Sequence, residues 1–372
     1  MWSLLKKHSN KKNLLLVFML ISGTSYAGSW DHRGQLSIWA RPFNTNDEWK
    51  FGLGARYFPE LTLEYDLADE IFFDTEFSLN VFINSDFTTT NKEIKLYRLK
   101  FRIATAQSET RIGLQQLNFG PARMLRSLKW FDKIDPRDPL GMTDGVYAVR
   151  FKYNFLNNSE LWLWGLYGNE QTKGYELFPT AKNTPEFGGR LVVPVPSGEM
   201  ATTVHTRKVD ASLFEYRENQ FALDGRWDVE IGCWFESVFQ QSKSDFIPYE
   251  WQKFITIGAD YTFSVGNGLY VAAEHMMLAM SDDLLGSDLD YNNSAVMMSY
   301  PLNIMDNINI VTYYSWDTDK FYNYIQWQRT WDYYSLNIGL FYYPNANGFV
   351  MTQNDNVPMS GYGVQIMFVY NY

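Results

Sequence analysis

Apolar and polar residues alternate along many stretches of this chain, and no other feature of the sequence constrains the fold as strongly. Successive side chains of a β-strand point to opposite faces, so the alternation predicts strands with one apolar and one polar face. Several stretches approach or exceed the nine residues that a tilted strand needs to cross a membrane. The pattern is clearest in residues 60–67, 73–80, 97–103, 147–155, 221–230 and 255–264.

Two properties of these stretches distinguish them from strands of a large secreted β-protein, which is the soluble alternative. The apolar face often ends in an aromatic residue, as membrane-interface girdles require. The polar face carries full charges, which the core of a soluble sandwich could not bury unpaired but a water-filled lumen can hold. The aromatic ends are Tyr57, Tyr65, Phe155, Trp227, Phe263, Tyr314 and Tyr342.

The overall composition agrees with strands rather than helices as the membrane-crossing elements. Aromatic residues make up 17% of the chain, yet its mean hydropathy is −0.30. After the first 27 residues, no uncharged apolar run approaches the length of about 18 residues that a membrane helix needs. Averaging of lipid-facing and lumen-facing residues produces this mildly polar composition in a transmembrane barrel.

Counting the alternating stretches gives roughly 17–19 strands, and single-chain bacterial barrels use even numbers. We therefore expect an all-β fold, a transmembrane antiparallel β-barrel of about 18 strands, with 16 as the alternative. Residues 219–241 could form one overlong strand or two strands, and we favour two strands joined by a tight turn at Trp227-Asp228.

The first 27 residues have the composition of a secretory signal peptide. Four lysines precede the apolar run 14–21, and Ser25-Tyr26-Ala27 offers small residues at the cleavage positions. An N-terminal membrane anchor, the alternative, would need about 17–25 apolar residues. We expect residues 1–27 to be a signal peptide and 28–372 to be the barrel, in the outer membrane of a Gram-negative bacterium.

Charge and reactive residues exclude several function classes. Removing residues 1–27 would leave 28 Lys and Arg against 42 Asp and Glu, which argues against nucleic acid as a partner. The single Cys233 allows neither an intramolecular disulfide nor a thiolate metal cluster. Only His32, His205 and His275 follow the signal, and no Gly-x-Ser-x-Gly or His-Glu-x-x-His element is present. We expect no catalytic residues, no metal and no cofactor.

The C-terminal residues 362–372 alternate regularly and end on the aromatic Tyr372. This segment resembles the terminal strand by which outer-membrane barrels are recognised by their assembly machinery, although the usual last residue of that pattern is Phe. The resemblance implies the barrel-assembly machinery as a partner, besides outer-membrane lipid.

Residues 117–144 lack any period-two pattern and contain three prolines and nine charged residues. A long loop with its own composition is often functional. It could fold into the pore and narrow it, or lie outside as a loop pinned by internal salt bridges. In the first case its cations would contact a solute, namely Arg123, Arg126, Lys129 and Arg137. Both placements remain open from the sequence.

The segment around this loop resembles the alginate-export-type porin-like barrels. In those proteins an arginine-glycine-glutamine strand precedes a tryptophan-containing loop that ends in an aspartate-glycine pair. Here Arg111-Ile112-Gly113-Leu114-Gln115 precedes Trp130 and Asp144-Gly145, whereas the stretch 135–139 departs from the pattern. The resemblance covers about 40 residues and implies an outer-membrane channel, with acidic saccharides as a possible solute class.

Charged residues of the expected lumen face fall into two strips. Strips of this kind can tune channel selectivity, and the alternative is that they form cross-strand salt bridges that neutralise the wall. The basic strip consists of Arg98, Lys100, Arg102, Arg111, Arg150 and Lys152, and the acidic strip of Glu64, Asp66, Asp74 and Glu76.

These features together predict a porin-like channel that passes small hydrophilic solutes by diffusion. The basic strip would favour anionic or saccharide solutes. The alternative is a non-conducting barrel that serves as a surface adhesin or a structural protein.

Overall fold

The structure is a computed structural model that describes residues 28–68, 70–85, 89–244, 246–344 and 360–372. The signal peptide expected in residues 1–27 lies outside these residues. No helix in the described part of the chain is long and apolar enough to cross a membrane.

Eighteen β-strands account for the regular structure of the described residues. The first nine are β1 (Gly28–Thr45), β2 (Glu48–Ala68), β3 (Ile71–Ser85), β4 (Thr90–Ala104), β5 (Ser108–Gln115), β6 (Val146–Asn154), β7 (Glu160–Leu166), β8 (Glu186–Val195) and β9 (Gly198–Asp210). The others are β10 (Glu215–Asp228), β11 (Gly232–Lys243), β12 (Trp251–Phe263), β13 (Leu269–Ser281), β14 (Leu289–Pro301), β15 (Asp306–Ser315), β16 (Lys320–Thr330), β17 (Tyr334–Tyr343) and β18 (Gly361–Asn371).

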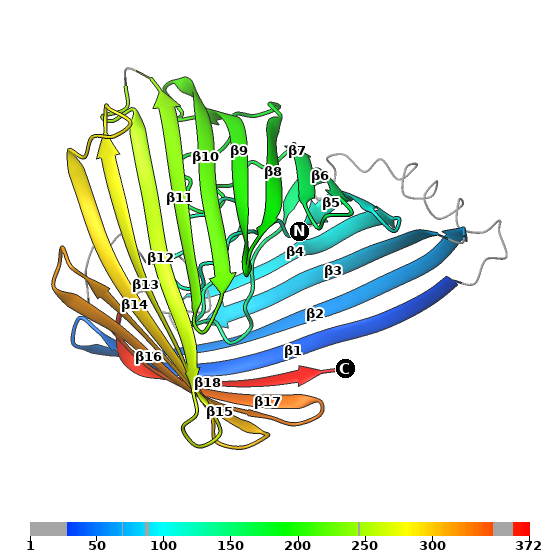
Figure 1. The fold of residues 1–372 in the computed structure, drawn as a ribbon. Coiled ribbons are helices and arrows are strands. Elements are labelled where there is room, and N and C mark those ends of the chain that lie inside the picture. Colours follow the sequence, from blue (N-terminus) through cyan, green and yellow to red (C-terminus); the bar gives the residue numbers. More distant parts are fainter. Residues whose placement is uncertain (1–27, 69, 86–88, 245, 345–359) are drawn as a thin grey trace, which may run out of the picture.

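Each strand pairs antiparallel with the next one in sequence, and β1 pairs with β18 to close the barrel (Figure 1). Closure leaves no sheet edge between the first and last strands, which is the condition for a sheet to exist in lipid. The predicted 18-stranded barrel is confirmed. The ambiguous stretch 219–241 forms two strands, β10 and β11, joined at residues 229–231, one position beyond the expected turn.

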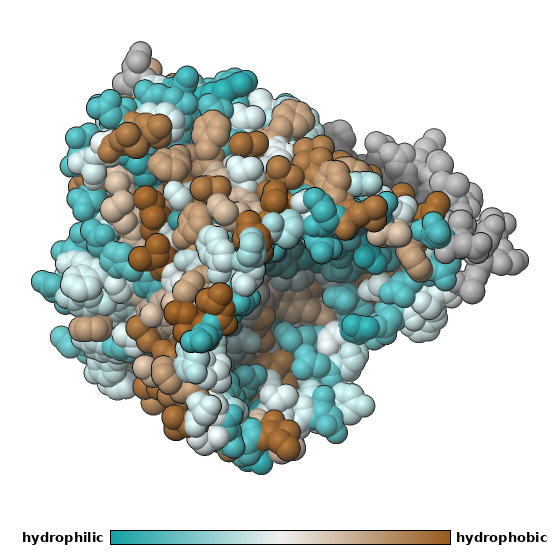
Figure 2. Space-filling view, in the orientation of Figure 1, coloured by the Kyte–Doolittle hydropathy of each residue, from teal (hydrophilic) through white to brown (hydrophobic). Residues whose placement is uncertain are grey.

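The two faces of the barrel wall follow the alternation of the sequence. In β3, Asp74, Ser78 and Asn80 are buried toward the interior, whereas Phe77 and Ile83 are exposed on the outside. Figure 2 shows apolar residues spread over the outer surface, and a hollow near the centre of the molecule where hydrophilic residues line much of the opening.

Connections at the two rims of the barrel differ in length. At one rim, which we call the turn rim, every connection has two to five residues. At the other, the loop rim, residues 116–145 and 167–185 form long connections. This asymmetry is typical of outer-membrane barrels, which carry short turns on the periplasmic side and longer loops outside.

Residues 116–145, which we call the inserted loop, fill the interior of the barrel. Leu125 and Leu128 of this loop are fully buried and belong to one apolar cluster with Met276 and Leu278 of β13. The loop leaves the wall after only eight residues of β5 and returns at the start of β6, which explains why these two strands are short.

Candidate functional site: the lumen and its loops

Two buried glutamates of the inner wall hold the first half of the inserted loop. Glu236 of β11 accepts hydrogen bonds from two backbone N–H groups and Glu274 of β13 from three, at donor–acceptor distances of 2.6–2.9 Å. Hydrogen bonds to a carboxylate are about twice as strong as neutral ones, so these contacts fix the loop to the wall. The donors are Ala122, Arg123, Met124, Leu125 and Leu128.

The second half of the loop crosses to the other side of the lumen. The guanidinium of Arg137 lies 5.6 Å from the ring centroid of Tyr313 in β15 and 5.1 Å from that of Tyr343 in β17. Further along, Leu140 packs against the β1, β3 and β18 cluster of apolar residues. The carbonyl of Thr143 then accepts a hydrogen bond from Arg98 of β4 at 3.0 Å. The loop therefore contacts the wall on both sides of the lumen.

Most charges of the inserted loop are satisfied within the loop itself. Arg126 pairs with Asp132, and Arg137 pairs with Asp135 at 2.5 Å. The Arg137 guanidinium holds the pKa of the Asp135 carboxyl below its usual value despite burial. Lys129 donates to the carbonyl of Ile134 at 3.0 Å, and burial lowers its pKa to about 8.

Of the four loop cations expected to contact a solute, Lys129 and Arg137 are buried and cannot do so, and the other two differ in accessibility. Arg126 is only 7% exposed and closed into its ion pair with Asp132, so it offers almost no surface. The side chain of Arg123 is 35% exposed and pairs with Asp260 of β12 at 3.0 Å. Its guanidinium lies over the rings of Trp234 and Tyr270. Arg123 is thus the accessible cation of the pair.

The basic strip occupies the neighbouring strands β4, β5 and β6. Arg102 lies directly opposite Arg111, and Arg111 lies directly opposite Arg150, so three arginines form a row across three strands. This row lies between the inserted loop and the turn rim, because Arg102 is close to the end of β4 at Ala104. Arg98 lies farther from the turn rim on β4, where it is buried against the inserted loop.

Carboxylates accompany most of the basic strip. Lys100 pairs with Glu76 at 2.5 Å and Arg102 pairs with Asp74, which join the acidic strip to the basic one. Lys152 pairs with Glu160 of β7 at 2.8 Å. These contacts are the cross-strand salt bridges that were the alternative interpretation of the strip.

One carboxylate, Glu109, contacts all three arginines of the row, and Arg102 has Asp74 as a second partner. Glu109 of β5 lies 3.4 Å from Arg102 and 2.8 Å from Arg111, and it also pairs with Arg150. Sequence reasoning overlooked Glu109, although it shares the polar phase of Arg111 two residues away. The three guanidiniums share two carboxylates, Glu109 and Asp74, and so leave an excess of one positive charge.

The remaining members of the acidic strip are more open. Glu64 and Asp66 of β2 are exposed, and Glu64 lies opposite Asp74 in the register of β2 and β3. The Ser29 hydroxyl donates to Glu64 at 3.3 Å.

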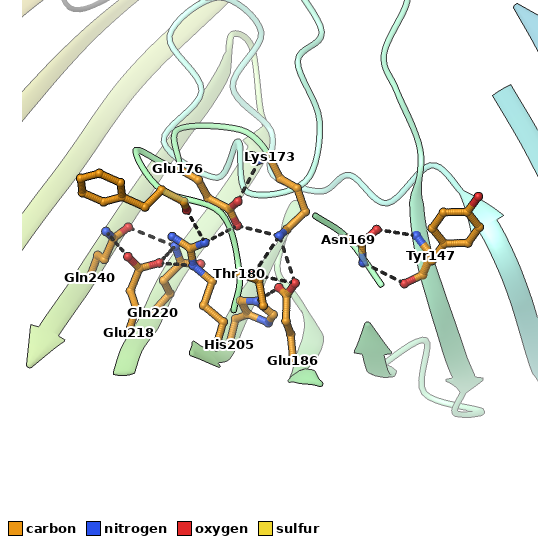
Figure 3. Close-up of polar contacts among 12 residues, drawn as sticks. Tyr147, Asn169, Lys173, Glu176, Thr180, Glu186, His205, Glu218, Gln220 and Gln240 are labelled. Atoms are coloured by element: carbon orange, nitrogen blue, oxygen red, sulfur yellow. Dashed lines mark hydrogen bonds and ion pairs between the residues drawn. The ribbon is translucent and has the colours of Figure 1, made fainter. Parts of the chain in front are cut away.

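A second long connection, residues 167–185, is tied to the inner wall by a buried polar network (Figure 3). Lys173 lies 2.9 Å from Glu176 and 3.0 Å from Glu186, and His205 lies 3.1 Å from Glu186. Arg207 of β9 pairs with Glu176 at 3.1 Å and with Glu218 of β10 at 2.6 Å, and so joins this connection to the wall. Burial raises the pKa of Glu176, and its two cationic neighbours only partly offset this effect. In the described residues, no group of three or more His, Cys, Asp or Glu side chains could hold a metal ion.

Comparisons with known proteins bear on this arrangement. No protein-family model and no curated protein sequence matches the chain. Solved structures do: Acinetobacter baumannii OccAB4 superposes with a TM-score of 0.60 at 10% identity, covering 94% of this chain and 99% of that one. The chain has the fold of an outer-membrane porin.

Two further structures support the same fold. The anion-selective porin from Comamonas acidovorans has a TM-score of 0.53 at 11% identity, with 93% of this chain and all of that one covered. The outer membrane channel DcaP of Acinetobacter baumannii has a TM-score of 0.52 at 11% identity, covering 94% and 99% of the two chains. The resemblance to alginate-export-type barrels stays a prediction, because no family model matches.

Proposed function

We propose that this chain is a channel of the bacterial outer membrane that lets small hydrophilic solutes diffuse through its lumen. The observation that carries the proposal is that the barrel is closed and apolar outside, while its inner wall is charged between the inserted loop and the turn rim. A wall of this kind suits water and ions, whereas a protein that uses only its outer surface has no need of it.

The inserted loop would set the narrowest part of this channel. It contacts the wall through Glu236 and Glu274 on one side and through Arg98 on the other. A loop held at both sides by charged hydrogen bonds acts as a fixed constriction rather than as a mobile gate.

Anionic or carboxylated solutes, acidic saccharides among them, are the favoured cargo of this proposal. Arg102, Arg111 and Arg150 share Glu109, and like charges directly opposite each other destabilise a sheet. A solute carboxylate would relieve that repulsion, and a guanidinium can bind it with two parallel hydrogen bonds. Arg123 supplies a further accessible cation from the inserted loop.

The conductance of planar lipid bilayers tests the channel. Addition of the purified, folded protein is expected to produce stable ion-conducting steps. A bilayer that stays sealed at high protein concentration would overturn the proposal and favour the non-conducting adhesin or structural barrel.

The anion preference needs a separate variant. Replacing Arg102, Arg111 and Arg150 together by Gln is expected to lower the anion-to-cation permeability ratio several-fold, measured as a reversal potential in a salt gradient. Lys208→Gln is the matched control, because Lys208 is exposed next to the buried, inward-pointing Arg207 and pairs only with Glu215 among the described charges. An unchanged ratio in the triple variant would remove the role of the arginine row.

A further inference from the structure

A pocket of ≈ 330 Å³ opens at the loop rim, away from the charged row near the turn rim. Residues of three connections and of β10–β13 form it, and aromatic side chains dominate its walls. Ligand sites typically combine such walls with a few polar groups. The aromatic lining consists of Phe178, Phe214, Tyr216, Phe246, Tyr249 and Trp251.

The aromatic walls are ordered by contacts among themselves and with the barrel. The ring centroid of Phe214 lies 4.9 Å from that of Phe246 and 6.0 Å from that of Tyr216. Arg207 donates a hydrogen bond of 3.0 Å to the carbonyl of Phe178 and so holds the connection 167–185 in place. Phe246 is nevertheless 75% exposed, so its ring is accessible to a ligand in the pocket.

The polar side of the pocket is formed by Glu218 and Gln240, which Figure 3 shows next to each other at the end of the buried network. Gln240 donates to Glu218 at 3.0 Å, and Arg207 donates to Glu218 at 2.6 Å. Gln220 donates to Gln240 at 3.0 Å, and its own buried Oε1 has no hydrogen-bond partner among the described residues. Oxygen acceptors therefore gather behind the aromatic walls.

We propose that this pocket binds an aromatic ring that carries a hydroxyl group, a phenol-like solute. The ring would stack against Phe214 and Phe246, since aromatic rings prefer offset or edge-to-face contact. The hydroxyl would donate to the oxygens of Glu218 or Gln240. A carboxylate is disfavoured beside Glu218, so the pocket selects a different chemistry from the arginine row. The pocket would capture such a solute at the mouth of the channel, and in this respect the inference rests on the proposed function.

Isothermal titration calorimetry with catechol tests the pocket on the full folded protein in detergent micelles, independently of ion conduction. Phe246→Ser is expected to weaken catechol binding at least tenfold, because the ring stacks on this side chain. Leu213→Ser is the matched control: Leu213 is 94% exposed beside Phe214 but is not part of the lining, and its loss is expected to leave binding unchanged.

Two comparison probes separate the aromatic claim from other ligands. Cyclohexane-1,2-diol carries the same hydroxyl groups without the aromatic ring, and glucose represents a saccharide. Either one binding as tightly as catechol would overturn the proposal, and so would catechol binding that Phe246→Ser leaves intact. Bilayer conductance of Phe246→Ser is expected to equal that of the unaltered chain. A barrel that binds catechol without conducting ions would contradict the channel and leave the pocket standing.

Discussion

Lys129 is a buried cation of the inserted loop whose surroundings penalise its charged form. Burial lowers its pKa to about 8, and Asp135 and Asp132 offset this only in part. Because the folded value lies below that of the unfolded chain, the unfolded chain binds more protons between pH 8 and about 10.4. The free energy of unfolding therefore rises with pH across this window, by about 3 kcal/mol from this group alone. Below pH 8 the penalty is fully present.

Lys129→Met removes the titrating group and keeps most of its volume. We expect the thermal unfolding midpoint of the unaltered protein to rise more between pH 8 and 10 than that of the variant. Lys133→Met, at a less buried position of the same loop, serves as the control and should keep the original pH profile. Parallel profiles for Lys129→Met and the unaltered protein would show that Lys129 is not desolvated as described.

The sequence identified the cations of the basic strip but not how far they are neutralised. Glu109 was recognisable, because it precedes Arg111 by two residues in the same phase. Glu160 was harder, since it is the first residue of β7 and directly follows a turn. The pairing of Lys100 with Glu76 depends on the register between β3 and β4, which shifts at a bulge next to Ser78 and Leu79. Alternation within one strand carries no information about such a register.

The two long connections meet where Gly174 approaches the inserted loop. A Cβ atom at Gly174 would lie 1.8 Å from the carbonyl oxygen of Lys129, and its φ of +44° also favours glycine. Gly174→Ala is therefore expected to push the two connections apart and to lower the thermal midpoint by several degrees. Gly168→Ala is the matched control, because its φ of +80° is equally left-handed but nothing lies within 4 Å. Equal losses in both variants would mean that backbone strain, not the contact, is responsible.

Strands could be predicted from the sequence because each one carries its own alternation, and this is why β10 and β11 were separable. The path of the inserted loop could not be predicted in the same way. Its backbone donates to Glu236 and Glu274, which lie 108–151 residues away in sequence. An irregular segment has no periodic pattern of side chains, so its sequence does not indicate which part of the wall it will contact. Its unusual composition indicated only that it was distinct from the strands.

The barrel and the inserted loop have separate roles in the proposed channel. An 18-stranded barrel with an empty lumen would be wide, and the loop occupies much of that lumen between β5 and the facing strands β11–β13. The wall thus supplies the passage through the membrane, and the loop supplies the constriction. This division predicts that the width of the channel can be altered without altering the wall.

Replacing residues 119–142 by a short Gly-Ser link tests this prediction. Removal of the loop is expected to raise the single-channel conductance several-fold, since current grows with the open cross-section, while heat-modifiable migration on gels reports that the barrel still closes. Shortening the connection 282–288, which joins β13 and β14 at the loop rim, is the control and should leave the conductance near its original value. A loop-deleted barrel that closes but conducts as before would show that the narrowest point lies elsewhere, most plainly at the arginine row of β4–β6.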